Sequence, residues 1–278
     1  TTVELADDQD VFIMEPMPPR ILFSGRARCL RYLSVGLPRI AQAFDQRKQV
    51  FVESFTDAFL YNALYSVVSP KDDSDVSLGF IEVGRKDNNL EKNAGCEQVK
   101  RIVKELRNNG NNRVYGIIDW DGKNLEKGGV IVVGINKRYA LENIILDPLL
   151  IGAAMIHMGM GKRLNLNDKI RFRELYSLTD LQVQNIVDAV EARLPFAKDC
   201  SRVTARYIGG QTALISDPYL TMNGKQLGSN LFDVFQELKK FRNISELMKH
   251  VATVIVPECP GLLPLEIYEV FSKIHNGS

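Results

Sequence analysis

The sequence predicts an α/β protein: a small parallel, Rossmann-like sheet flanked by helices, with a mostly helical C-terminal region. Apolar Val/Ile runs alternate with helical patterns in the order strand, helix, strand, helix, strand. These runs are nearly continuous, which is typical of strands covered on both faces. After residue 140 the helical patterns dominate. We therefore divide the chain into a lead-in and helical segment (1–48), an α/β core (49–140) and a mostly helical region with short strands (141–278).

Composition narrows the class of protein. The chain has 278 residues, of which 45% are hydrophobic and 25% charged, as in ordinary globular domains. Its net charge of +1 neither requires nor excludes nucleic acid, so any phosphate-binding surface must be local. The four scattered cysteines contain no C-x-x-C pair and are typical of reduced thiols in a cytoplasmic protein. Three separated histidines argue against a zinc site.

The N-terminus carries no signal-peptide pattern, and the longest apolar run is broken by Asp147 and Pro148. We therefore expect a buried helix there and no membrane span. The N-terminal segment predicts an extended lead-in over 1–19, a short strand from Arg20 and basic helical pieces between Leu30 and Phe44. The core predicts, in order, a strand at 49–53, a helix at 56–68, a strand at 77–83, an amphipathic helix at 93–106 and strands at 114–118 and 129–133.

The C-terminal region predicts a helix over 140–158, kinked at Pro148, and further helices. Thr179 and Gln182 form a capping box for one of them. Asn223-Gly224 predicts a tight turn. The remaining helices are expected at 166–175, 179–194, 231–241, 244–256 and 265–275, and short strands at 202–208, 211–215 and 219–222.

Two carboxylates, Asp119 and Asp121, follow the predicted strand at 114–118. Residues i and i+2 of a strand project to the same face, so these acids would repel each other unless a cation lay between them. Hard oxygen ligands at this spacing suit Mg²⁺. An ordinary polar turn explains the same residues equally well, because Asp and Gly are common turn residues.

Parallel sheets place their sites outside the carboxyl ends of the strands. Glu53 ends the first core strand, so the topology brings it to the same rim as Asp119 and Asp121. Ser54 and Asp57 fit a capping box for the following helix. We expect Asp57 also to contribute an acid to the rim.

Three ordered motifs resemble the TOPRIM domain of OLD-family nucleases and related bacterial anti-phage defence effectors. They are Val52-Glu53-Ser-x-Thr-Asp57, then Gly116-Ile-Ile-Asp119-Trp-Asp121, then Arg138-Tyr-Ala-Leu-Glu142-Asn143. Asn223-Gly-Lys-Gln-Leu227 resembles a further segment in the helical insertion of those proteins. The resemblance covers roughly residues 49–240. Ser54 stands where that family usually has Gly, and Ile144 where it usually has Tyr.

The resemblance implies a Mg²⁺-dependent endonuclease that hydrolyses phosphodiester bonds in DNA or tRNA, using one or two Mg²⁺ ions that Mn²⁺ can replace. Its catalytic residues correspond to Glu53, Asp119 and Asp121, and its metal environment also includes Asp57 and Glu142. Plain helix surface explains Glu142 and Asn143 as well. The family also implies a separate ABC-type ATPase partner, because no G-x-x-x-x-G-K-[ST] motif is found in this chain.

Lys123, Lys137 and Arg138 lie close to the acidic motif in sequence, and we expect them to contact the phosphate backbone. The sequence is also compatible with a homo-oligomer. Two other functions remain open. The acids could hold a structural ion in a regulatory or interaction module, or the domain could be a nucleotidyl transferase.

Overall fold

The computed structural model describes residues 12–16, 19–23, 47–69, 77–83, 95–164 and 170–277. The chain forms two compact units, one of residues 1–48 with 71–78 and the other of residues 49–70 with 79–278. In the first unit, strands β1 (Phe12–Pro16) and β2 (Pro19–Phe23) pair as an antiparallel hairpin. The sequence predicted the second of these strands but not the first. The basic helical pieces predicted between Leu30 and Phe44 lie outside the described residues.

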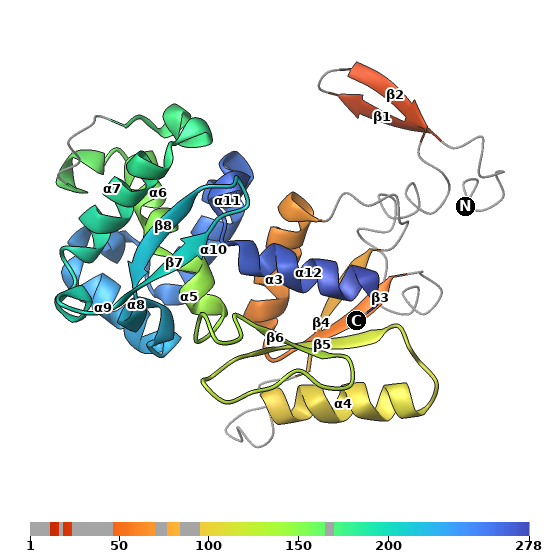
Figure 1. The fold of residues 1–278 in the computed structure, drawn as a ribbon. Helices are drawn as coiled ribbons and strands as arrows, with labels where there is room; N and C mark the ends of the chain where they lie inside the picture. Colours follow the sequence, from red (N-terminus) through yellow and green to blue (C-terminus); the bar gives the residue numbers. More distant parts are fainter. Residues whose placement is uncertain are drawn as a thin grey trace. The chain divides into compact units, whose positions relative to one another are not determined.

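A four-stranded parallel sheet confirms the predicted fold class (Figure 1). Its spatial order is β4-β3-β5-β6. In register, Val50 lies opposite Tyr115, and Ile117 lies opposite Ile131. The strands span β3 (Lys48–Val52), β4 (Leu78–Glu82), β5 (Val114–Asp119) and β6 (Val130–Val133).

Helices cover both faces of this sheet, which explains the nearly continuous apolar strands. Helix α4 (Cys96–Asn108) lies on one face, where Val99 and Val103 pack against β5 and β6. A Cβ on Gly116 would lie 2.6 Å from Val99 Cγ1, so glycine allows this close approach. Helices α3 (Phe55–Val68) and α12 (Leu265–Asn276) lie on the other face, joined through the aromatic rings of Tyr61, Phe80 and Phe271.

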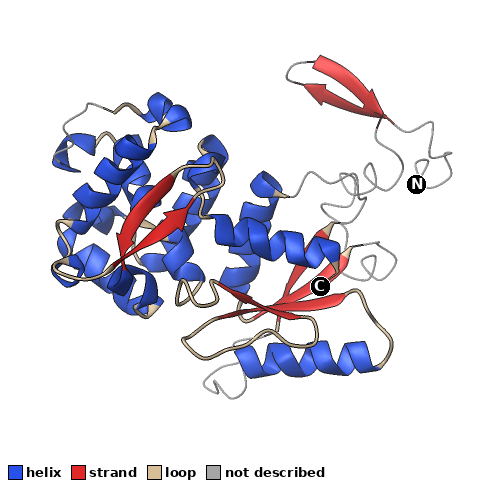
Figure 2. Cartoon of the chain, in the orientation of Figure 1, coloured by secondary structure: helices blue, strands red, loops and turns tan. Residues whose placement is uncertain are grey.

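The region after β6 is mostly helical, as predicted (Figure 2). Residues on both sides of the predicted boundary at 140 belong to the second compact unit, and Tyr139 N donates a hydrogen bond to Leu220 O. The elements are α5 (Leu141–Ile145), α6 (Pro148–His157), α7 (Asp180–Glu191), β7 (Arg202–Arg206), β8 (Thr212–Ser216), α8 (Asp217–Thr221), α9 (Gly224–Val234), α10 (Ile244–His250) and α11 (Val256–Glu258). A π-helical stretch, Val251–Ile255, joins α10 to α11. Short 3₁₀ helices include Gly161–Leu164, Phe172–Ser177, Pro195–Ala197, Gln236–Lys240 and Pro260–Leu262.

Several predicted elements in this region are wrong in detail. The single kinked helix over 140–158 is two helices, because Asp147 accepts a hydrogen bond from Leu149 N and caps α6, with Pro148 in its first turn. The strand predicted at 219–222 is part of helix α8. Asn223 is no hairpin turn but the N-cap of α9, accepting from the backbone N–H groups of residues 225 and 226.

Other C-terminal predictions agree more closely with the structure. The capping box of Thr179 and Gln182 is confirmed, with both hydrogen bonds present. The helix predicted at 231–241 begins earlier, as α9, and gives way to a 3₁₀ turn. Among the described residues, no helix combines the length and apolar character needed to cross a bilayer.

Candidate acidic site at the carboxyl edge of the sheet

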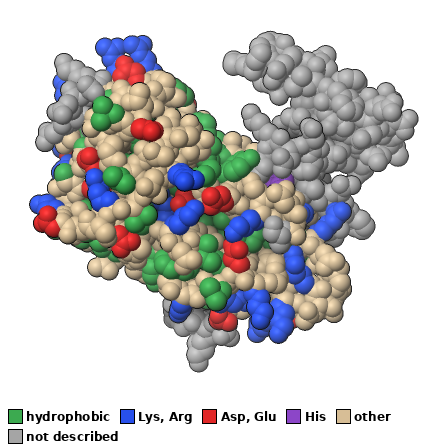
Figure 3. Space-filling model, viewed as in Figure 1, with side chains coloured by type: hydrophobic (Ala, Val, Ile, Leu, Met, Phe, Trp, Pro, Cys, Tyr) green, Lys and Arg blue, Asp and Glu red, His purple; other side chains and the backbone are tan. Residues whose placement is uncertain are grey.

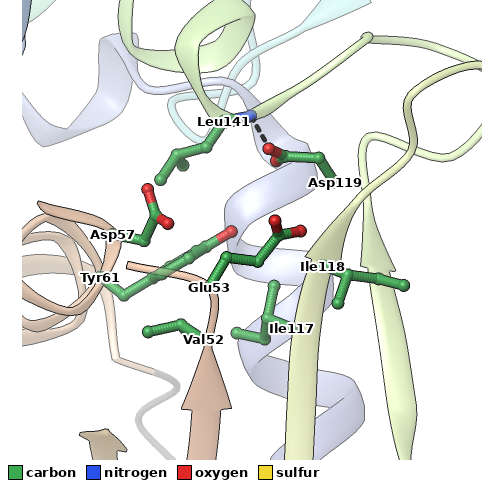
Figure 4. Close-up of a pocket in the computed structure, with 8 residues that line it drawn as sticks. All are labelled: Val52, Glu53, Asp57, Tyr61, Ile117, Ile118, Asp119 and Leu141. Carbon is green, nitrogen blue, oxygen red and sulfur yellow. Dashed lines mark hydrogen bonds between the residues drawn. The ribbon is translucent and has the colours of Figure 1, made fainter. Parts of the chain in front are cut away.

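The carboxyl ends of β3 and β5 meet at a small pocket lined by three acids (Figure 4). Glu53 follows β3 directly, Asp119 is the last residue of β5, and Asp57 lies in the first turn of α3. Their carboxyl groups face a shared space beside the Tyr61 hydroxyl. β3 and β5 are neighbours in the sheet, so residues 66 positions apart in sequence reach one rim. The other lining residues are Val52, Ile117, Ile118 and Leu141.

Asp57 both lines the pocket and forms hydrogen bonds with Ser54, the N-cap of α3. Ser54 is the N-cap of α3, and its hydroxyl oxygen accepts a hydrogen bond from Asp57 N at 3.2 Å. The same hydroxyl donates to Asp57 Oδ2 at 2.7 Å. The predicted cap is therefore present, and it fixes the orientation of the carboxylate. Ser54, which replaces the usual glycine of the resembling family, supplies this contact.

Asp119 is held by the start of helix α5 and by the loop after β5. Its Oδ1 accepts a hydrogen bond from Leu141 N, at the first residue of α5, at 2.8 Å. Asn124 Nδ2 donates to the Asp119 backbone carbonyl at 2.8 Å. These contacts fix the end of the strand and leave Asp119 Oδ2 directed to the pocket side.

Asp121 does not continue the strand as predicted. β5 ends at Asp119, and Asp121 has φ 50°, in the left-handed region, with its N–H donating to Tyr139 O at 2.9 Å. Strand alternation therefore does not place Asp119 and Asp121 on one face, and that prediction is wrong, because alternation requires both acids to lie within the strand. Asp121 nevertheless lies close enough for its charge to raise the pKa of Glu53.

Glu142 lies in the first turn of α5, against the start of α9. A Cβ on Gly224 would lie 2.6 Å from Glu142 Cβ. Burial is the main factor raising the Glu142 pKa; nearby Asp57 raises it further, and Lys225 lowers it. Sequence reasoning assigned no role to Lys225, because only the tertiary fold brings the start of α9 to Glu142.

The helix-surface interpretation of Glu142 and Asn143 is wrong for Asn143. That side chain is fully buried and its Nδ2 donates to Tyr219 O at 3.1 Å and to Met222 O at 2.9 Å. Asn143 therefore joins α5 to α8. Its neighbour Glu142 is only partly buried.

The acids share an unfavourable electrostatic environment. Burial raises the pKa of Glu53 to about 7; the Asp119 backbone lowers it, and the charges of Asp57, Asp121 and Glu142 raise it. Burial also raises the pKa of Asp57, and it raises that of Asp119 well above its usual range with help from Glu142. Glu53 Oε1 is buried and has no hydrogen-bond partner. A cation among these groups would offset both burial and mutual repulsion.

The donor set suits a hard cation. Among the described residues, no three or more His, Cys, Asp or Glu side chains form a ready-made coordination group. Mg²⁺ needs fewer, because it commonly binds one or two carboxylates and keeps several waters. The carboxylate oxygens around the pocket, and Glu53 Oε1 in particular, fit this mode of binding.

The predicted phosphate contacts divide into exposed and buried residues. Lys123 is exposed, and Lys137 is half-exposed and forms an ion pair with Glu269 at 3.4 Å. On the face shown in Figure 3, described basic and acidic side chains are interspersed, without a field of one sign.

Arg138 cannot contact a phosphate backbone, and that prediction is wrong. Its side chain is 1% exposed. The guanidinium donates to Asp147 Oδ2 and to Asn143 O, each at 2.7 Å, and Nε lies 3.7 Å from Glu266 Oε1. The Tyr207 hydroxyl donates to Asp147 Oδ1 at 3.1 Å. Arg138 thus ties the loop after β6 to α6 and α12.

No family model matches the chain, and no significant match was found among curated proteins. The resemblance to the TOPRIM domain therefore rests on the ordered motifs quoted above.

Proposed function

We propose that this protein is a Mg²⁺-dependent nuclease that hydrolyses phosphodiester bonds in DNA or tRNA. The observation that carries the proposal is the meeting of Glu53, Asp57 and Asp119 in one pocket, with a buried, unpartnered Glu53 Oε1. Such an arrangement costs stability unless it serves a charged ligand. Asp121 and Glu142 add negative charge around the same pocket.

When bound, Mg²⁺ would supply Lewis-acid stabilisation of charge on the scissile phosphate. Asp119, which accepts a hydrogen bond from Leu141 N, and Asp121 would hold the ion. Glu53, at the end of β3 in the same pocket, would accept a proton from the attacking water. Lys123 and Lys137 contact the phosphate backbone beside the site.

The direct test is cleavage of supercoiled plasmid DNA and of tRNA with Mg²⁺ or Mn²⁺. Wild type should cut at least one substrate, and Glu53→Gln should lose at least about a hundredfold in rate, the lower range for a general base. Glu105→Gln, on the exposed face of α4, is the matched control and should retain full activity. Equal cleavage by wild type and Glu53→Gln would remove Glu53 from the mechanism.

Metal binding can be followed without activity. Trp120 is the only tryptophan of the chain, and it lies between Asp119 and Asp121. Its fluorescence should change on titration with Mn²⁺, and Asp119→Asn should weaken the apparent affinity at least about tenfold because a coordinating charge is lost. An unchanged affinity in that variant would place any metal elsewhere.

The biological setting rests on the resemblance alone: an effector of bacterial anti-phage defence controlled by a separate ABC-type ATPase. Co-purification of an ATPase with the tagged protein, from cells that carry the neighbouring genes, tests this. A purified protein that is fully active without any ATPase would contradict it.

The alternatives have distinct outcomes in the same assays. Metal binding without cleavage of DNA or tRNA would favour a structural ion in a regulatory or interaction module. Incorporation of labelled nucleotide on a single-stranded template would favour nucleotidyl transfer.

A further inference from the structure

Two phenylalanines are exposed on helix α3, at its start beside the acidic site. Phe55 is 65% exposed and Phe59 is 37% exposed. They are four residues apart, so both project from the same face of the helix. The opposite face, with Leu60, Leu64 and Val68, is buried in the core. Packing within the chain therefore leaves most of the Phe55 side chain and part of the Phe59 side chain exposed.

Both rings lie close to the acids along the chain. Phe55 is the first residue of α3 and lies two positions after Glu53. At 1.5 Å rise per residue, Phe59 is about 6 Å further along the helix axis. That step is close to the spacing of successive nucleotides in an extended single strand, roughly twice the 3.4 Å of a stacked duplex strand.

A cation accompanies the aromatic pair. Lys249 Nζ, from α10, lies 5.3 Å from the centre of the Phe59 ring. Further along the same face the exposed positions are polar, Asn62 and Ser66. The surface is thus two rings and a cation rather than a broad apolar patch. Stable protein interfaces bury about 800 Å² on each partner, far more than two rings offer.

We propose that Phe55 and Phe59 form a stacking platform for unpaired bases of a single-stranded nucleic acid, with Lys249 beside an adjacent phosphate. Aromatic rings next to a cation match the way proteins hold single strands without reading sequence. The bases of an intact duplex are already stacked and cannot use such a platform. The inference rests on the proposed nuclease function and gives that site a substrate class: nucleic acid with an unpaired segment next to the cleaved bond.

Binding of fluorescein-labelled dT20, U20 and a blunt-ended DNA duplex, measured by anisotropy with Mg²⁺, tests the platform. All proteins carry Glu53→Gln to prevent cleavage. Phe55→Ala should weaken single-strand binding by about tenfold, as expected for loss of one stacked base. Phe55→Tyr should restore it because the ring is kept. Leu181→Ala, at a 71% exposed leucine on α7, is the control for loss of exposed apolar surface.

The outcomes separate this inference from the proposed function. Single-strand affinity that falls in Phe55→Ala, is kept in Phe55→Tyr and exceeds duplex affinity supports the platform. Binding that is unchanged in both Phe55→Ala and Phe59→Ala overturns the platform, while cleavage by the parent protein would leave the nuclease proposal standing. Equal losses on the single strand and the duplex overturn the preference for unpaired bases. No binding to any probe overturns the platform, and absence of cleavage then overturns the nuclease as well.

Discussion

Two groups of acids lie within the second compact unit: Asp147 and Glu266 are buried, whereas Glu53 and its neighbours are partly buried, and their surroundings differ. Around Asp147, burial raises the carboxyl pKa, but Arg138, Leu149 N and the Tyr207 hydroxyl oppose that rise. Around Glu53, the charges of Asp57, Asp121 and Glu142 add to the effect of burial and raise the carboxyl pKa further. Buried charges in a stable fold are normally paired with an opposite charge. The group that contains the Arg138 cation is therefore structural, whereas the cluster of acids around Glu53 is the candidate for binding a cation.

The largest expected effect comes from breaking the paired group. Arg138→Met should lower the free energy of unfolding by about 3–5 kcal/mol, because Asp147 and Glu266 would remain buried without their cation. Urea denaturation measures this change. The double variant Arg138→Met/Asp147→Asn should recover part of the loss. A loss below about 1 kcal/mol would show that this network is not needed for the fold.

A smaller effect on the free energy of unfolding is expected at the acidic site when divalent cations are removed. It arises from acids that lie close together, rather than from the loss of a buried cation. The pKa of Glu53 is about 7 when folded and 4.5 ordinarily, so between these values the folded state binds more protons than the unfolded state. Stability must then fall as pH rises through this range. With EDTA present, wild type should be on the order of 2 kcal/mol more stable at pH 5 than at pH 8.

Glu53→Gln isolates the contribution of that one group. Asp57, Asp119 and Glu142 also have raised pKa values and act in the same direction. The pH dependence should therefore shrink in Glu53→Gln without vanishing. The lowered pKa of His250, caused mainly by burial, acts in the opposite direction in both proteins. Identical pH profiles of wild type and variant would show that Glu53 has no raised pKa.

The smallest effect is expected next to Arg138 in sequence. Lys137→Ala should change the free energy of unfolding by less than about 0.5 kcal/mol, because its ion pair with Glu269 is half-exposed and screened by water. Thermal and urea denaturation beside Arg138→Met measure the contrast. A loss of stability comparable to that of Arg138→Met would mean that burial does not account for the difference between the ion pairs of Lys137 and Arg138.

Sequence reasoning succeeded where local pattern and topology act together. Apolar runs predicted β3 and β5, and the rule that sites lie at the carboxyl ends of parallel strands brought Glu53 to Asp119. It failed where a distant partner decides the conformation. Asp121 leaves the strand while bonded to Tyr139, and Arg138 is buried by groups from α6 and α12.

The sequence by itself determined the strands and helices of the α/β core and the cap of α3, because strand periodicity and capping depend on neighbouring residues. Only the tertiary structure decided that Arg138 is structural, that Lys225 lies near Glu142 and that Phe55 and Phe59 remain exposed. Burial and charge pairing are set by residues far apart in the chain. Their positions follow from packing, which no local pattern encodes.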